Sequence, residues 1–168
     1  MKQPSIKIQL LRTFAWAISN LLNSKDIPIS LATIALDKLE QFLVIDDRKI
    51  KEDTLFGLQY LSNNPNLIDI IFESNIVGMN LKAFLNSQDE DLKYLALTVF
   101  GNLFLSERSD HLDTLLNLGV LEEVFRIIKS KPNDSTMKSC LWILSNIVLD
   151  YKQAVVEIFN HDIMNILI

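Results

Sequence analysis

The chain has 168 residues, a formal net charge of −5, and a composition that is 49% hydrophobic. This apolar content excludes an intrinsically disordered chain, and an acidic balance argues against a surface that binds nucleic acid, which needs clustered Lys and Arg. The sequence contains only four Gly and four Pro, which are few for a β-rich protein with many tight turns. We therefore predict an all-α protein.

Targeting segments and disulfides are not indicated. Residues 1–11 lack the apolar core of a signal peptide, and no window of the sequence is apolar enough to span a membrane. The single cysteine, Cys140, cannot form an intrachain disulfide, which is typical of a reducing compartment. We expect a soluble intracellular protein with no membrane partner.

Four apolar helices are predicted in chain order, at about 10–22, 51–61, 89–105 and 135–149, with Asp89 and Ser135 as candidate N-caps of the last two. Each carries an anchor residue followed, four residues later, by a polar residue and then an aliphatic one. The anchors are Trp16, Phe56, Thr98 and Trp142, and the polar residues are Asn20, Tyr60, Asn102 and Asn146. Successive anchors lie 40, 42 and 44 residues apart, within the range of roughly 40–47 residues of HEAT and armadillo repeats.

A second motif repeats in phase with the first. A turn-like residue separates two apolar helices at Asn75, Gly119 and Asp162, and these residue types tolerate turn conformations. We therefore predict units of a short helix, a middle helix and a longer third helix. The expected boundaries are a first third helix at 10–22, a second repeat at 28–61, a third at 66–105, a fourth at 110–149, and the start of a further repeat at 151–168.

The predicted fold is an all-α, armadillo-repeat right-handed superhelix, an α-solenoid of about four repeats, with the four anchors on one face. Solenoids normally carry polar capping repeats at their ends. Neither end of this sequence has a polar cap, so we expect a fragment of a longer array.

The third-helix motifs resemble the Trp-x-x-x-Asn signature of importin α, the armadillo adaptor that binds nuclear localisation signals. The full motif occurs twice, a Tyr replaces the Asn in the second unit, and a Gly-Asn without Trp occurs in the third, in the order of that family's central repeats. The matching residues are Trp16 and Asn20, Tyr60, Gly101 and Asn102, and Trp142 and Asn146. The resemblance covers nearly the whole chain and is closest to about the fourth to seventh repeats.

The resemblance implies an adaptor that binds basic peptides on its concave face for nuclear import and is found in cytoplasm and nucleus. An indole offers a wall for the stem of a Lys side chain, and an exposed Asn binds peptide backbone through its donor and acceptor. The implied peptide-binding residues are Trp16, Asn20, Asp53, Phe56, Tyr60, Asn102, Trp142 and Asn146. Asp53 matches an acidic position of the family. Importin β would bind only through a basic segment that is absent from this sequence.

Other interpretations of these residues remain open. A Trp in an apolar helix is usually part of the core, Tyr60 could fill a gap between helices, and an isolated Asp such as Asp53 is more often solvated. The chain also departs from the family pattern at Asn23, Thr98 and Ser139, where the family often has Arg, a basic residue and an acid. The alternative function is therefore an armadillo scaffold in a cytoskeletal or ciliary assembly, in which the motif residues are inherited but unused.

No catalytic motif is found, so we expect neither an enzyme nor a cofactor. His111 and His161 lie in different repeats, without metal-ligand spacing, and are interpreted as solvated helix ends. Cys140 is interpreted as a small buried residue. The expected partners are Lys/Arg-rich segments of other proteins and not nucleic acid.

Overall fold

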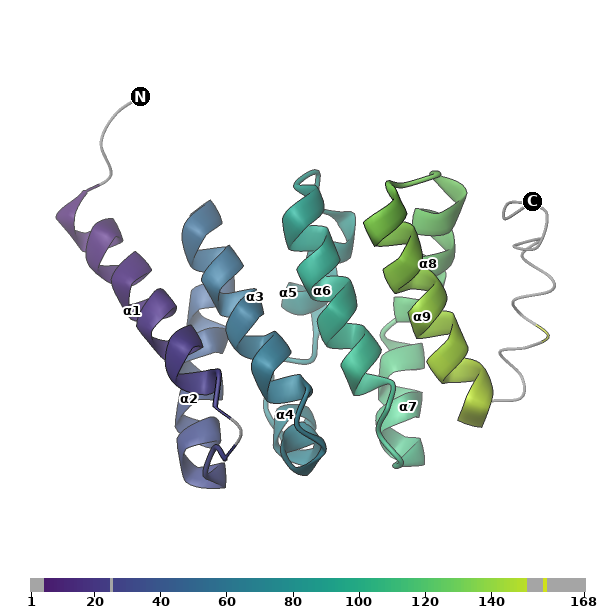
Figure 1. Cartoon of the computed structure of the whole chain (residues 1–168), viewed down its shortest axis with the longest axis horizontal. Coiled ribbons are helices and arrows are strands. Elements are labelled where there is room, and N and C mark those ends of the chain that lie inside the picture. Colours follow the sequence, from purple (N-terminus) through teal and green to yellow (C-terminus); the bar gives the residue numbers. More distant parts are fainter. Residues whose placement is uncertain (1–4, 25, 151–155, 157–168) are drawn as a thin grey trace. The chain divides into compact units, whose positions relative to one another are not determined.

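The computed structural model describes residues 5–24, 26–150 and 156, and it divides the chain into two compact units, residues 1–81 and 82–168. Every regular element among the described residues is a helix, and these residues form no strand (Figure 1). The predicted all-α class is confirmed. None of the described helices is both long and apolar enough to cross a bilayer.

The first unit is a two-layered arrangement of helices. Its elements are α1 (Ile6–Leu22), α2 (Ile29–Leu43), α3 (Arg48–Ser62), the 3-10 helix η1 (Pro65–Leu67), α4 (Ile68–Glu73) and the start of α5 (Met79–Lys82). Helices α1 and α3 lie side by side, and α2 and α4 pack behind them (Figure 1). The layers meet in a core of fully buried aliphatic side chains, among them Leu22, Leu39 and Leu58.

Polar caps determine where the two third helices of this unit, α1 and α3, begin. Ser5 accepts a hydrogen bond from the Ile8 amide at the start of α1, and Asp47 accepts one from the Ile50 amide at the start of α3. Capping satisfies amides that have no partner in the first turn of a helix. One long helix, α2, occupies the place where a short and a middle helix were expected.

The second unit repeats the layered arrangement. It contains the 3-10 helix η2 (Ala83–Asn86), α6 (Glu90–Leu103), α7 (Ser109–Asn117), α8 (Val120–Lys129) and α9 (Asp134–Asp150). Helices α6 and α9 lie side by side, α8 and η2 pack behind them, and α7 packs on α8 (Figure 1). Phe100, Val124 and Ile143 are fully buried between the layers.

The junctions of the second unit partly match the predictions. Asp89 caps α6 as expected, by accepting from the amides of Asp91 and Leu92. The expected N-cap at Ser135 is wrong, because Asn133 accepts from the Thr136 amide at 2.9 Å and α9 already begins at Asp134. Gly119 joins α7 to α8 in the left-handed region, with φ of 74°. The expected turn at Asp162 lies outside the described residues.

Candidate functional site

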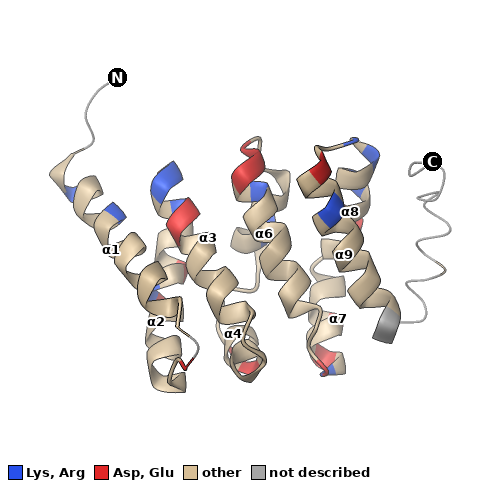
Figure 2. Cartoon of the chain, viewed as in Figure 1, with Lys and Arg blue, Asp and Glu red and all other residues tan. Residues whose placement is uncertain are grey.

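Charge is unevenly distributed along the third helices, α1, α3, α6 and α9. Figure 2 shows Lys, Arg, Asp and Glu in the N-terminal half of each helix. Uncharged residues follow in α1, α3 and α6, and in α9 as far as residue 149. In α6, for example, the charged residues are Glu90, Asp91 and Lys93, and residues 94–103 carry none. The aromatic and amide residues of the repeated motif therefore lie on the C-terminal side of the charged residues of each helix.

In the first unit, the motif residues of α1 face solvent. The Trp16 side chain is 56% exposed and Asn20 is exposed, so this indole does not belong to the core. On the neighbouring helix α3, Phe56 and Tyr60 are half-buried. An exposed Trp next to half-buried aromatic residues forms a surface suited to binding an apolar stem or a peptide.

Asp53 of α3 is 4% exposed, so the interpretation of this residue as solvated is wrong. One carboxylate oxygen, Oδ1, lies 3.1 Å from Nζ of Lys49, one turn earlier on the helix. The other, Oδ2, is buried and has no hydrogen-bond partner among the described residues. A buried carboxylate oxygen without a donor is energetically costly, which makes Asp53 a candidate acceptor for a donor group of a ligand.

In the second unit, α6 and α9 enclose a groove of 320 Å³. The groove is lined by Tyr94, Thr98, Ser135, Lys138, Ser139 and Trp142. The anchors Thr98 and Trp142 thus share one face of this unit. Thr98 donates its hydroxyl to the Tyr94 carbonyl at 3.0 Å, which leaves its methyl group as the main surface it can offer.

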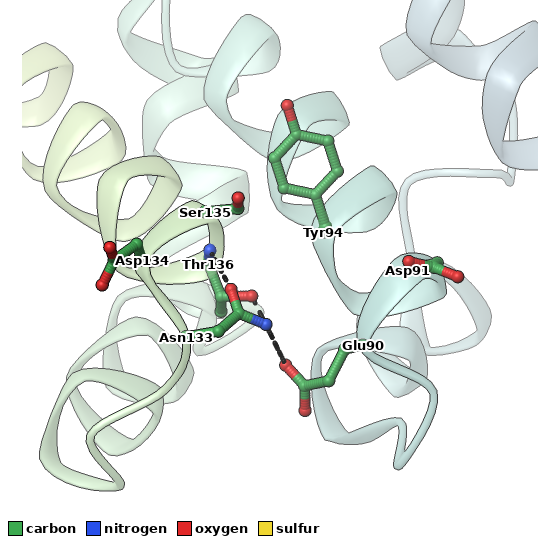
Figure 3. A pocket seen from close by; sticks show the side chains of 7 residues that line it. All are labelled: Glu90, Asp91, Tyr94, Asn133, Asp134, Ser135 and Thr136. Carbon is green, nitrogen blue, oxygen red and sulfur yellow. Dashed lines mark hydrogen bonds between the residues drawn. The ribbon is translucent and has the colours of Figure 1, made fainter.

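A larger hollow of 780 Å³ continues the groove toward the N-terminal ends of α6 and α9, and the two share Tyr94 and Ser135 (Figure 3). Asn133 and Thr136 donate long hydrogen bonds, both 3.4 Å, to Oε2 of Glu90, and Lys93 lies 2.6 Å from Oε1. Figure 3 shows Glu90 turned toward Asn133. The Glu90 carboxylate therefore serves as a link between the two helices.

A second link joins the helices farther along the groove. The Asn146 side chain donates from Nδ2 to the Gly101 carbonyl at 3.1 Å and is only 7% exposed. Asn102 is buried as well. The expectation of exposed amides is therefore wrong at both positions, and at Asn146 the close packing of α6 and α9 accounts for the burial.

Gly101 also provides the surface on which Trp142 lies. A Cβ atom at position 101 would stand 2.2 Å from Cζ3 and 2.6 Å from Cε3 of the Trp142 indole. No real side chain tolerates such distances, so the indole occupies the space that the missing side chain leaves. The Trp142 side chain is nevertheless 36% exposed, which leaves part of the ring open to the groove.

His111 and Cys140, which could in principle bind a metal or act as a nucleophile, lie in surroundings that suit a structural role. His111 is buried, and its Nδ1 lies 2.7 Å from the Ser106 hydroxyl, so the interpretation as a solvated helix end is wrong. Cys140 is buried as predicted, and burial raises the pKa of its thiol to about 12, which disfavours the reactive thiolate. His161 lies outside the described residues. Within the described part of the chain, no three His, Cys, Asp or Glu residues are grouped to hold a metal ion.

Comparison with known proteins identifies importin α subunits as relatives. No protein-family model matches the chain. Importin subunit alpha-2 of Caenorhabditis elegans is 27% identical over 138 residues, which cover 80% of this chain and 25% of that protein. Importin subunit alpha-7 of Arabidopsis thaliana is 25% identical over 142 residues, 81% of this chain and 26% of that protein. The chain thus spans about a quarter of the length of these relatives and consists of importin α-like armadillo repeats.

Solved structures confirm the fold. A designed armadillo repeat protein in complex with the peptide (KR)4 matches 97% of this chain with a TM-score of 0.83 and 14% sequence identity. Computationally designed armadillo repeat proteins for modular peptide recognition match 95% of the chain with a TM-score of 0.80 and 13% identity. The predicted armadillo-repeat fold is therefore correct.

Proposed function

We propose that these importin α-like repeats bind an extended, Lys/Arg-rich segment of another protein on the third helices of each unit. The observation that carries this proposal is the exposure of two indoles on third helices. Trp16 lies on α1 among other exposed apolar side chains, such as Phe14, whereas Trp142 is exposed on α9, where Ile143, Leu144 and Ile147 are buried. An indole face attracts a cationic head group and packs against its methylene stem. A contact of this kind suits Lys and Arg better than other residues.

The preference for a basic ligand is further supported by Asp53. Its unpaired carboxylate oxygen is placed one turn before Phe56, on the helix next to Trp16. An ammonium or guanidinium group that reached this oxygen would supply the missing donor and an opposite charge. The known complex of a designed armadillo repeat protein with (KR)4 is consistent with such a ligand for this fold.

A role in nuclear protein import is the finer part of the proposal. It is supported by the importin subunit alpha relatives and by the order of the motif variants along the chain. The bound segments would then be nuclear localisation signals of cargo proteins, and the protein would occur in cytoplasm and nucleus. We infer no catalytic activity, because the motif residues offer contacts and not a nucleophile with its base.

The alternative function, a scaffold without a peptide ligand, is favoured by one observation. Asn146 and Asn102 are buried, and the Asn146 amide already donates to Gly101, so two of the three Asn residues of the motif are withdrawn from solvent. A scaffold would keep these contacts and use other surfaces for its partners.

The two functions are distinguished by titrating the peptide (KR)4 against the chain in a calorimeter. We expect Trp142→Ala to weaken binding by roughly 30-fold, because removal of an aromatic anchor commonly costs about 2 kcal/mol. Leu31→Ala, which removes an apolar residue of similar exposure (39% against 36%) from α2, is the matched control and should leave the affinity unchanged. A peptide with Gln in place of every Lys and Arg should not bind. Equal affinity of Trp142→Ala and the wild type would support the scaffold.

A further inference from the structure

Trp142 is the less exposed of the two indoles, and its position depends on the neighbouring helix. One part of the ring lies over the backbone of α6, where a Cβ at Gly101 would approach three ring atoms at 2.2, 2.6 and 3.0 Å. The other part, which makes the side chain 36% exposed, lines the groove between α6 and α9. The indole is thus held on one side and accessible on the other.

The helix that carries Gly101 is itself fixed relative to α9. The Asn146 amide, one turn after Trp142, donates to the carbonyl of the same glycine at 3.1 Å. This bond is buried, so water competes with it little and its geometry is well defined. Gly101 therefore makes two contacts with α9. The Trp142 indole occupies the space of the missing side chain, and the Gly101 carbonyl oxygen accepts a hydrogen bond from the Asn146 amide.

We propose that Gly101 and Asn146 form a seat for the Trp142 indole, and that this seat sets the orientation in which Trp142 meets a bound peptide. Gly101 is then a positioning residue, which acts on the ligand through Trp142. An anchor whose rotamer is fixed before binding loses less conformational entropy when the ligand arrives. The inference rests on the proposed function and names the residues that give its site in the second unit a defined shape.

The seat explains why the amide of this repeat is not available to a ligand. In the first unit, Asn20 is exposed at the corresponding position, whereas the Asn146 amide donates a hydrogen bond to the Gly101 carbonyl. We therefore infer two different kinds of subsite. The α6–α9 groove binds through a fixed indole, and α1 offers an indole together with an accessible amide.

Gly101→Ala tests the seat directly. The added methyl group has no room beside the ring, and a partly exposed Trp can rotate away from it, so the indole should move toward solvent. In a Trp16→Phe background, Trp142 is the single Trp of the chain, and its fluorescence reports this movement. We expect a red-shifted emission, stronger quenching by acrylamide, and about tenfold weaker binding of (KR)4.

Two further variants keep the test decisive. Gly57→Ala makes the same change in α3, where the new Cβ would meet flexible Leu39 methyl groups at 3.2 and 3.3 Å, and it should leave the Trp142 emission unchanged. Trp142→Leu combined with Gly101→Ala removes the clash, so the double variant should be more stable than the sum of the two single changes predicts. It should still bind (KR)4 as weakly as Trp142→Leu alone.

Unchanged emission and unchanged affinity in Gly101→Ala would overturn the inference, as would additive stability effects in the double variant. Altered emission with unchanged peptide affinity would show a seat without a role in binding, and would overturn the positioning role. If the wild type binds no (KR)4, the proposed function fails and the positioning role fails with it. The emission and the double variant would then show separately whether Gly101 holds the indole.

Discussion

Individual amide side chains of the repeated motif have different surroundings, and stability measurements should reveal this. Asn146 is buried and bonded to the Gly101 carbonyl, so Asn146→Ala leaves that buried acceptor without its donor. We expect a loss of about 1–2 kcal/mol in the free energy of unfolding, measured by urea denaturation. Asn20→Ala, the same change at the exposed corresponding position, should cost less than about 0.5 kcal/mol. Equal costs for the two variants would contradict the difference in burial.

The pair of Arg12 and Asp47 predicts how stability depends on pH. Arg12 donates to both carboxylate oxygens of Asp47 at 2.8–3.2 Å, and this hydrogen bonding holds the pKa of Asp47 below its usual range. A carboxyl group with a lowered native pKa stabilises the fold above its unfolded pKa of about 4. That contribution disappears as the pH falls through the lowered native value.

Asp47→Asn isolates this effect, because Asn remains a good N-cap for α3 while the charge is lost. The variant should be less stable than the wild type at pH 7, and the difference should shrink as the pH falls below about 4. Chemical denaturation at a series of pH values measures it. A difference that is the same at pH 7 and pH 3 would show that the charge of Asp47 is not the cause.

At the scale of elements, the junction of α7 and α8 depends on one glycine. Gly119 has φ of 74°, and an added Cβ would also lie 3.0 Å from Nζ of Lys82. Gly119→Ala should therefore cost about 1–2 kcal/mol of unfolding free energy, because residues with a side chain are strained in the left-handed region. Gly78→Ala, where the new Cβ would make only an ordinary contact of 3.4 Å with the Asn75 carbonyl oxygen, is the control and should change stability little. Thermal or urea unfolding of both variants measures the two changes in stability, and equal changes would contradict the special role of Gly119.

The four third helices could be predicted from the sequence, because their apolar residues follow the helical period and their anchors follow the repeat. Their first turns could not. Helix α1 begins at Ile6 and not near residue 10, and α3 begins at Arg48 and not at residue 51. In both helices the side chain of the N-cap residue, Ser5 or Asp47, fixes the start, and the first turn of α3 is mostly charged, so its apolar period begins later. The single helix α2 replaces the expected short and middle helices because residues 29–43 contain no Gly, Pro or Asn at which the helix could be interrupted.

The site was predicted less completely than the helices. Spacing of four residues places Trp142 and Asn146 on one face of α9, but it does not say which atoms of α6 lie opposite. The burial of Asn146 depends on the Gly101 carbonyl, and the orientation of Trp142 depends on the absence of a Cβ. A glycine in the apolar middle of a helix was the available signal, because Gly disfavours helices and a close approach often explains its presence there.

At the scale of the whole molecule, the proposal is that the third helices present two indoles to a basic peptide. Within the two units, α2 packs against α3 and α8 packs against α9. A net charge of −5 attracts any basic peptide weakly, so affinity alone does not prove where the peptide binds. The location of the contact is therefore the quantity to measure.

Nuclear magnetic resonance provides that measurement. The sequence contains two Trp residues, so a spectrum of the ¹⁵N-labelled chain contains two indole Nε1–H signals, assigned with Trp16→Phe and Trp142→Phe. We expect (KR)4 to shift both indole signals saturably, together with amides of the adjacent third helices, and to leave the amides of α2, α7 and α8 in place. Shifts that are confined to the amides of α2, α7 and α8, or indole signals that do not move at saturating peptide, would contradict the claim that the third helices bind the peptide.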